Sequence, residues 1–551
     1  MTLPAHLNDI TPRSTTTPVE QCLVHISNEL AALAEAVRVL CSSRNGFARA
    51  HVSCLPPEIL ATVFMCIEES SQSFPNKGHR PTSVTVTHVC RHWRRVALEC
   101  PSLWAFIHTS TSVRWMGIML ERSRKAALVV SCNVTTLPPD SLEQVLSQLP
   151  RIKVLRLHSY HWDFDRTLDH LLSQPAPLLQ EFRFTVLGDS LGRTLKPLSD
   201  AIFQQRTPQL RSLELMNCSF SWTSCIFSGL RTLCVRGASS TLPELLPALK
   251  RMPGLERLAL EQLSIISGGS NAFFDRVPLV RLKSIVFSGT IQTAVALFAH
   301  LALPDNVKIA LNLAKVEGPQ SLSDLLSAMK KSPGKFGPVF RSLRTIFWCL
   351  TTVVQFSTSI KHRPPSTWNA SDDDVPLSIQ FQSDSPVAIQ PPILFDICRL
   401  VTQGTIRTLS LSSSKDLDQF WRTGSAHFPE LEEIHVNSSS IEGLFAALET
   451  VNTQNADIAY RSLRVLDLEN IDITRGYPDY LHGIITVRNS HHCGSLRHLR
   501  LVECRGLMVK DVQLLSDVIE DIDWDGLEEV LESDSGSVDC GCPECSEYDY
   551  Y

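Results

Sequence analysis

The 551-residue sequence lacks several features that would assign it to a functional class at once. Its formal net charge is only −6, so no overall basic character indicates nucleic-acid binding. The longest apolar runs, 294–303 and 345–354, are too short to cross a bilayer, and we expect no membrane association. The first thirty residues lack a basic region followed by an apolar core. We therefore expect a protein of the cytoplasm, the nucleus or both.

Motifs of the common enzyme classes are also missing. The chain has no P-loop, no dinucleotide-binding glycine fingerprint, no G-x-S-x-G and no HExxH. His161, Asp163 and Asp165 bring acid and base groups together, but no nucleophile motif accompanies them. We expect no catalytic residues, no enzymatic activity and no cofactor.

The 17 cysteines are spread through the chain, many of them at apolar positions, and we expect reduced, buried thiols. Cys540, Cys542 and Cys545 have a spacing that could wrap one zinc ion. A fourth ligand is missing, and the neighbouring carboxylates oppose thiolate formation. A cysteine-containing disordered tail without metal is the simpler interpretation.

Two short apolar helices are predicted between residues 50 and 108. Pro57 suits the first turn of a helix, where its missing N–H would have no partner. The first helix then places Ile59, Leu60, Val63, Phe64 and Ile67 on one face. The second places Val86, Val89, Cys90, Trp93, Val96 and Ala97 on one face, and it ends near Pro101. Such small helices need a further partner, in the chain or on another protein.

These residues resemble the F-box, the motif that docks substrate receptors onto the Skp-type adaptor of cullin–RING ubiquitin ligases, and the resemblance is to its fungal F-box-like form. It rests on Leu55-Pro56-x-Glu58-Ile59-Leu60-x-x-Val63-Phe64, on Val89-Cys90-x-x-Trp93-Arg94-x-Val96-Ala97, and on Pro101-Ser102-Leu103-Trp104. A polar insert at 68–83 is longer than the family's turn. The resemblance implies an adaptor-binding set of Leu55, Pro56, Pro57, Glu58, Ile59, Leu60, Val63, Phe64, Val89, Cys90, Trp93 and Val96.

A longer helix is predicted before this module, over residues 17–44, after a disordered segment 1–16. Thr17 is its cap and Pro18 its first residue. Its apolar residues follow a 3-4-3-4-3 spacing typical of a heptad seam: Leu23, Ile26, Leu30, Leu33, Val37 and Leu40. The helix either packs on the F-box-like region or pairs with a second copy.

Internal repetition predicts the fold of residues 125–519. The pattern L-x-x-L-x-L begins at residues 152, 179, 210, 230, 255, 282, 406, 431, 463 and 496, with a weaker copy at 343. Two wide gaps each contain a plausible strand, at 307–313 and 377–381. Helical patterns lie between, at 141–149, 195–205, 242–251, 291–301, 321–330, 392–401, 441–451 and 510–519. This resembles an irregular leucine-rich-repeat solenoid, an α/β fold with a curved parallel sheet.

Two segments are predicted to lie outside this solenoid. Residues 364–376 are rich in proline and aspartate and are interpreted as an exposed excursion. Residues 520–551 carry many carboxylates and no lysine or arginine, and we expect a disordered acidic tail.

The residue at the centre of each L-x-L should point away from the core and could contact a target protein. These residues are Arg156, Arg183, Glu214, Cys234, Ala259, Val286, Ser410, Glu433, Asp467 and Arg500. With Arg236 and Arg257 added, the early repeats are basic and the late ones acidic. The target-binding candidates are Arg156, Arg183, Glu214, Arg236, Arg257, Glu433, Asp467 and Arg500. A partner with the opposite charge gradient is one interpretation, and a merely polar surface is the other.

Two main functions follow from these patterns, and a third hypothesis is an enzyme or metalloprotein that uses the cluster of Cys540, Cys542 and Cys545. The first is a substrate-recognition subunit of an SCF-type ubiquitin ligase, with the F-box-like module on the adaptor and the repeats on a protein target. The second is a leucine-rich-repeat interaction scaffold without ligase association, which the long insert at 68–83 motivates.

Overall fold

The computed structural model describes residues 18–47, 55–71, 82–108, 113–188, 197–266, 275–314, 319–329, 339–347, 351–359, 375–382, 391–402, 404–413, 417–437, 441–449, 451–452, 457–473, 477–490 and 496–528. It divides into a first unit, residues 1–128, and a second unit, residues 129–551. No helix within the described ranges is long and apolar enough to span a bilayer. The segments 1–16 and 360–374, the insert residues 72–81 and the tail cysteines lie outside these ranges.

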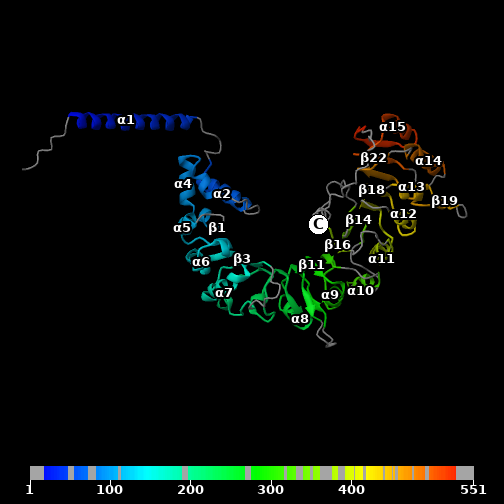
Figure 1. Ribbon diagram of the computed structural model, residues 1–551, viewed down its shortest axis with the longest axis horizontal. Coiled ribbons are helices and arrows are strands. Elements are labelled where there is room, and N and C mark those ends of the chain that lie inside the picture. The colour runs from blue at the N-terminus through cyan, green and yellow to red at the C-terminus, as the bar shows by residue number, and fades with distance from the viewer. Residues whose placement is uncertain are drawn as a thin grey trace, which may run out of the picture. The chain divides into compact units, whose positions relative to one another are not determined.

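The first unit is mainly helical (Figure 1). Its elements are α1 (Pro18–Phe47), α2 (Pro57–Ser71), α3 (Thr82–Val86), α4 (Arg91–Glu99), the 3-10 helix η2 (Pro101–Trp104), β1 (Phe106–His108) and α5 (Val113–Arg122). The helix predicted over 17–44 is therefore confirmed as α1, with a longer C-terminal end.

The prediction of one continuous second helix in this module is wrong, because the chain forms two helices there, α3 and α4. Val86 ends α3, and α4 begins only at Arg91. Between them Cys90 has an extended backbone, and its sulfur accepts a hydrogen bond from the backbone N–H of Trp93 at 3.4 Å. Such a cap fixes where a helix begins. Val86 is therefore buried, whereas Val89 is exposed in the turn before α4.

Trp104 organises the core of the first unit. Its indole N–H donates to the Ala97 carbonyl at 2.7 Å, so the buried ring has its polar atom satisfied. The Arg122 guanidinium lies 4.4 Å from the ring centroid, in cation–π geometry. Phe64 of α2 packs against Trp93 of α4, with ring centroids 5.0 Å apart. The two helices are thus fixed to each other through their apolar faces.

The second unit is an α/β structure with a large, mostly parallel, open sheet. Its main strands are β2 (Leu128–Asn133), β3 (Ile152–Tyr160), β4 (Glu181–Leu187), β5 (Ser212–Met216), β6 (Thr232–Arg236), β8 (Arg257–Glu261), β11 (Ser284–Gly289), β13 (Lys308–Leu313), β14 (Ser342–Phe347), β15 (Thr351–Ser357), β16 (Leu377–Gln382), β17 (Thr408–Ser413), β18 (Glu433–Asn437), β21 (Val465–Glu469), β22 (His498–Val502) and β23 (Asp521–Trp524). Every L-x-x-L-x-L copy contributes one strand, and both strands expected in the wide gaps form.

Smaller pairs of strands lie beside this sheet. They are β7 (Ser239–Thr241) with β9 (Ser264–Ile266), β10 (Val277–Pro278) with β12 (Leu301–Ala302), and β19 (Val451–Asn452) with β20 (Asp457–Ile458). The first two pairs are parallel and the third is antiparallel.

The expectation of a purely parallel sheet is wrong at β15. Spatially the strands run β13, β16, β15, β14 and β17, and β15 is antiparallel to both of its neighbours. Only three residues separate β14 from β15, too few for the crossover that a parallel pair needs. The flanking pairs β13–β16 and β14–β17 are again parallel.

Helices alternate with the strands, and in Figure 1 α9 to α14 lie along one side of the sheet. The helices of this unit are α6 (Pro139–Leu146), α7 (Phe164–Ser173), α8 (Leu242–Lys250), α9 (Ile291–Ala299), α10 (Pro319–Met329), α11 (Pro391–Thr402), α12 (Asp418–Gly424), α13 (Glu442–Glu449), α14 (Tyr477–Ser490) and α15 (Val509–Ser516). The predicted patterns missed α7, α12 and α14.

The helix expected over 195–205 is wrong in its described part. Only a 3-10 turn, η6 (Ile202–Gln205), forms there, and Phe203, Gln204 and Gln205 have φ between 51° and 57°. Left-handed backbone at these residues cannot continue a right-handed helix.

The disorder expected from residue 520 is also wrong at its start. Residues 521–524 form β23, parallel to β22, so the sheet extends past the predicted boundary at 519. Ile522 and Trp524 alternate with Asp521 and Asp523, a strand pattern within an acidic segment.

Candidate functional site

Three aliphatic side chains on α2 form an exposed apolar stripe. Ile59, Val63 and Ile67 are 50%, 41% and 45% exposed, and their spacing of four residues places them on one helical face. Leu60 and Phe64 each follow a stripe residue by one position, which turns them about 100° around the helix, and they are completely buried and anchor α2 to the rest of the module. We call Ile59, Val63 and Ile67 the α2 stripe. About half of each of these side chains is accessible to solvent.

The structure divides the predicted adaptor-binding residues by exposure. Leu60, Phe64 and Val96 are buried, so they build the module and leave docking to others. Leu55 and Trp93 are partly exposed. The exposed members are Pro56, Pro57, Glu58, Ile59, Val63, Val89 and Cys90. Ile67 was absent from the predicted set, although its position on the apolar face of α2 could have placed it there.

The second unit carries a continuous row of residues across the sheet, which we call the central row. Strand register places its members next to one another: Arg156, Arg183, Glu214, Cys234, Ala259, Val286, Ala310, Ser378, Gln355, Arg344, Ser410, His435, Asp467, Arg500 and Asp523. The antiparallel strand β15 keeps the row intact through Gln355. Nearly all predicted L-x-L centres belong to it.

One predicted position in this row is wrong. The centre between Ile434 and Val436 is His435, and Glu433 lies two residues earlier in the strand. Asp467 and Ser410 are also buried, which differs from the exposed positions expected for them. Arg257 is exposed on β8.

In the early strands three arginines pair with a glutamate on the next strand of the sheet. Arg156 Nε lies 2.7 Å from Glu181, and Arg183 Nε lies 2.6 Å from Glu214. Farther along, Arg236 lies 3.5 Å from Glu261. We call these pairs the Arg–Glu ladder. Because these three cations are matched by carboxylates, most of the basic half of the predicted charge gradient is neutralised within the chain.

Burial shifts the protonation of the Glu214 carboxylate in this ladder. Desolvation raises the pKa of Glu214, and the nearby Arg183 guanidinium offsets only part of that increase. The pairs are partly solvated, so each stabilises the fold only modestly.

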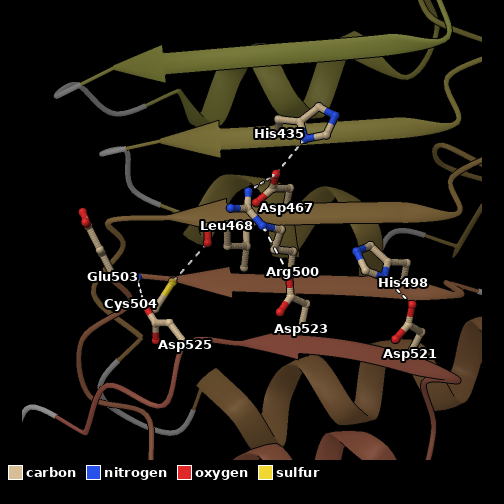
Figure 2. Close-up of polar contacts among 10 residues, drawn as sticks. All are labelled: His435, Asp467, Leu468, His498, Arg500, Glu503, Cys504, Asp521, Asp523 and Asp525. Atoms are coloured by element: carbon tan, nitrogen blue, oxygen red, sulfur yellow. Dashed lines mark hydrogen bonds and ion pairs between the residues drawn. The ribbon is translucent and has the colours of Figure 1, made fainter. Parts of the chain in front are cut away.

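The late strands carry a buried polar network, shown in Figure 2. His435 Nδ1 on β18 lies 3.0 Å from Asp467 Oδ2 on β21, and the same oxygen accepts a hydrogen bond from Arg500 on β22 at 3.0 Å. Arg500 Nε lies 3.6 Å from Asp523 on β23, and His435 Nε2 lies 3.6 Å from Glu433. Carboxylates and bases therefore alternate across four neighbouring strands.

The network shifts the protonation of its two most buried groups. Burial disfavours the charged form of His435, but hydrogen bonds to Asp467 and Glu433 outweigh it and raise the pKa of His435 above its ordinary value of 6.5. Burial also disfavours the Asp467 carboxylate, yet His435 and Arg500 hold the pKa of Asp467 below 3.8. The arrangement favours an imidazolium–carboxylate pair.

Neighbouring polar contacts tie the last strands together. His498 Nδ1 lies 2.8 Å from Asp521 Oδ2, and the Cys504 thiol lies 3.3 Å from the Leu468 carbonyl (Figure 2). Burial raises the pKa of the Cys504 thiol to about 12, as it does for Cys132 and Cys218. These cysteines are therefore protonated, buried side chains, as predicted. The prediction of buried thiols is wrong for five other described cysteines, which are exposed: Cys22, Cys41, Cys66, Cys90 and Cys225.

The described part of the chain contains no group of three or more metal-ligating side chains. His161 and Asp163 form a 3-10 turn before α7, where the Asp163 carbonyl accepts a hydrogen bond from the Thr167 hydroxyl. Trp162 stacks on Tyr160 with ring centroids 4.5 Å apart. The predicted acid–base cluster is thus a helix entrance, and the absence of catalysis stays a prediction.

Part of the first unit matches a known protein-family model. Residues 52–110 match the family model described as F-box-like, a region that contains α2, α3, α4 and η2. The match covers the three sequence blocks from Leu55 to Trp104. No curated protein matches the chain. The F-box-like region supports a role as an adaptor or substrate receptor in ubiquitin-ligase complexes.

Proposed function

We propose that the protein is a substrate receptor of an SCF-type ubiquitin ligase. The observation that carries the proposal is the exposed α2 stripe within a region that matches the F-box-like family. A Skp-type adaptor would cover this stripe, and the adaptor would join the receptor to the cullin. The protein itself would perform no catalysis and would raise the concentration of its target near the ubiquitin-transfer machinery. Its place of action would be the cytoplasm or the nucleus.

Docking would draw on the apolar area of the α2 stripe. Complete burial of an aliphatic side chain stabilises a complex by at most about 1.5–3 kcal/mol, and these side chains are already about half buried. Val89, exposed before α4, would extend the same contact. Glu58 in the first turn of α2 interacts favourably with the helix dipole and would lie at the rim of the contact with the adaptor.

The second unit would hold the target as a leucine-rich-repeat solenoid of fungal F-box-like type. Strand–helix alternation, buried leucines in register and a continuous central row support this assignment. A repeat of one strand and one helix cannot bury its own apolar face, and stacking with its neighbours does so. The accessible members of the central row and the exposed Arg257 would face the target protein.

The proposal is tested by binding of the full-length chain to a purified Skp-type adaptor. The variant Ile59→Asp/Val63→Asp places two carboxylates in the contact, where burial without partners is costly. The matched control is Val113→Asp, which changes a similarly exposed valine at the start of α5. We expect the wild type and the control to bind and the double variant to lose binding. Equal binding by the double variant would show that the α2 stripe is not the docking surface.

The alternative is a leucine-rich-repeat scaffold that has no ligase partner. The long segment between α2 and α3 motivates it, since the family joins these parts by a shorter turn. A folded wild type that binds no Skp-type adaptor would support this alternative over a ligase receptor.

A further inference from the structure

α1 exposes a heptad seam over residues 23–40. Leu23, Ile26, Leu30, Leu33, Val37 and Leu40 follow the spacing 3-4-3-4-3, and each is between 53% and 69% exposed. These residues occupy alternating a and d positions of a heptad. The seam spans residues 23–40 of this 30-residue helix, a length of about 26 Å. A seam of this length would be left in water by a single chain.

The residues beside the seam indicate which helix would pack against it. Between Cys22 and Cys41 the flanking e and g positions hold cysteine, serine, alanine and a single charged residue, Glu29. In a parallel pair of α1 helices Glu29 faces Ala34 of the second copy, and in an antiparallel pair it faces Ala36. Self-pairing therefore opposes no like charges in either orientation, and the small flanking side chains permit close approach.

A foreign helix is less well matched to this surface. Coiled-coil partners are selected mainly through complementary charges at e and g, and α1 offers one such charge there. Glu35 and Arg38 pair with each other on the outer face of the helix, at positions f and b. Their charges are thus satisfied within one chain and turned away from the seam.

We propose that α1 joins two copies of this chain into a homodimer through the seam Leu23, Ile26, Leu30, Leu33, Val37 and Leu40. Each dimer would carry two F-box-like modules and two repeat units. The proposal does not rest on adaptor binding, because the seam belongs to α1 and the α2 stripe to another helix.

The mass of the full-length chain in solution tests the proposal. Sedimentation equilibrium under reducing conditions, at about 1–50 µM, should give close to twice the 61.4 kDa of one chain. The variant Leu30→Glu/Leu33→Glu places charges at two central seam positions and should be monomeric. The control Val24→Glu/Val39→Glu removes two equally exposed valines outside the seam and should remain dimeric.

A second variant separates loss of pairing from loss of the helix. Leu30→Ala/Leu33→Ala keeps strong helix formers, so α1 should persist while dissociation becomes easier by at least roughly tenfold. Monomeric wild type across the concentration range would overturn the proposal. So would a dimer that survives both seam variants, or one that the Val24/Val39 control abolishes equally. Adaptor binding should be retained by the seam variants, which distinguishes this proposal from the proposed function.

Discussion

His435 on β18 lies in register with Asp467 on β21, and its Nδ1 is 3.0 Å from the Asp467 carboxylate although both side chains are buried. Arg500 on β22 donates to the same carboxylate oxygen. Charges that are taken out of water stay ionised only when partners compensate them. Asp467 is thus the shared anion of two bases on neighbouring strands.

Asp467→Asn should destabilise the second unit strongly. The change removes the anion and leaves two bases facing a neutral amide, and loss of one partner from a buried pair costs about 3 kcal/mol or more. Asp523→Asn is the control, since Asp523 is 65% exposed and lies 3.6 Å from Arg500, so its loss should cost less than about 1 kcal/mol. Urea unfolding monitored by circular dichroism measures the loss of stability in both variants. Equal effects of the two variants would contradict the central role of Asp467.

The His435 contact should make stability depend on pH in a defined direction. The folded protein holds the His435 proton more tightly than the unfolded chain, because its pKa is raised. The contribution is therefore complete below the ordinary pKa of 6.5 and is lost as pH rises through the higher folded value.

The comparison of wild type with His435→Gln measures this contribution. The wild type should exceed the variant in free energy of unfolding at pH 5.5–6, and the difference should shrink as the pH rises above about 7. The low pKa of Asp467 acts in the opposite range, since its contribution is lost only as the pH falls through the folded value below 3.8. A difference that grows toward alkaline pH would contradict the assignment.

The strands of the second unit could be predicted from the sequence because leucine at fixed spacing reports directly which face is buried. Leu213 and Leu215 are both nearly inaccessible, as the repeat pattern requires. The direction of a strand could not be predicted in the same way. Val354 and Phe356 of β15 are buried on one face, but apolar alternation is the same for a parallel and an antiparallel strand.

The candidate sites were predictable only in outline. The apolar face of α2 was identified, yet periodicity could not tell which side the module covers, so Leu60 and Val63 received the same role. The polar network was missed for a different reason. His435 and Asp467 are 32 residues apart, and only the strand register brings them together.

The Arg–Glu ladder should contribute little to stability, but the free energy of unfolding should fall when a like-charge pair replaces an opposite-charge pair. Arg183→Glu places two carboxylates on adjacent strands and should cost about 1 kcal/mol, since Arg183 is 40% exposed. The double variant Arg183→Glu/Glu214→Arg restores an opposite pair and should regain most of that loss. A double-mutant cycle by urea unfolding measures the coupling. A double variant less stable than Arg183→Glu would show that the side chains do not act as a pair.

Substitutions at Leu60 and Val63 should have different effects on folding and on adaptor binding, although both residues belong to α2. Leu60→Ala removes a completely buried side chain and should destabilise the first unit by about 2–4 kcal/mol. Val63→Ala trims a side chain that is 41% exposed, so its effect on stability should stay below about 1 kcal/mol. Hydrogen–deuterium exchange of α2 and α4 reports the stability of this unit, and titration with a Skp-type adaptor reports docking. Under the proposed function Val63→Ala should weaken adaptor binding while exchange stays slow, whereas Leu60→Ala should accelerate exchange before adaptor is added. Slow exchange in Leu60→Ala would show that α2 is not anchored through Leu60.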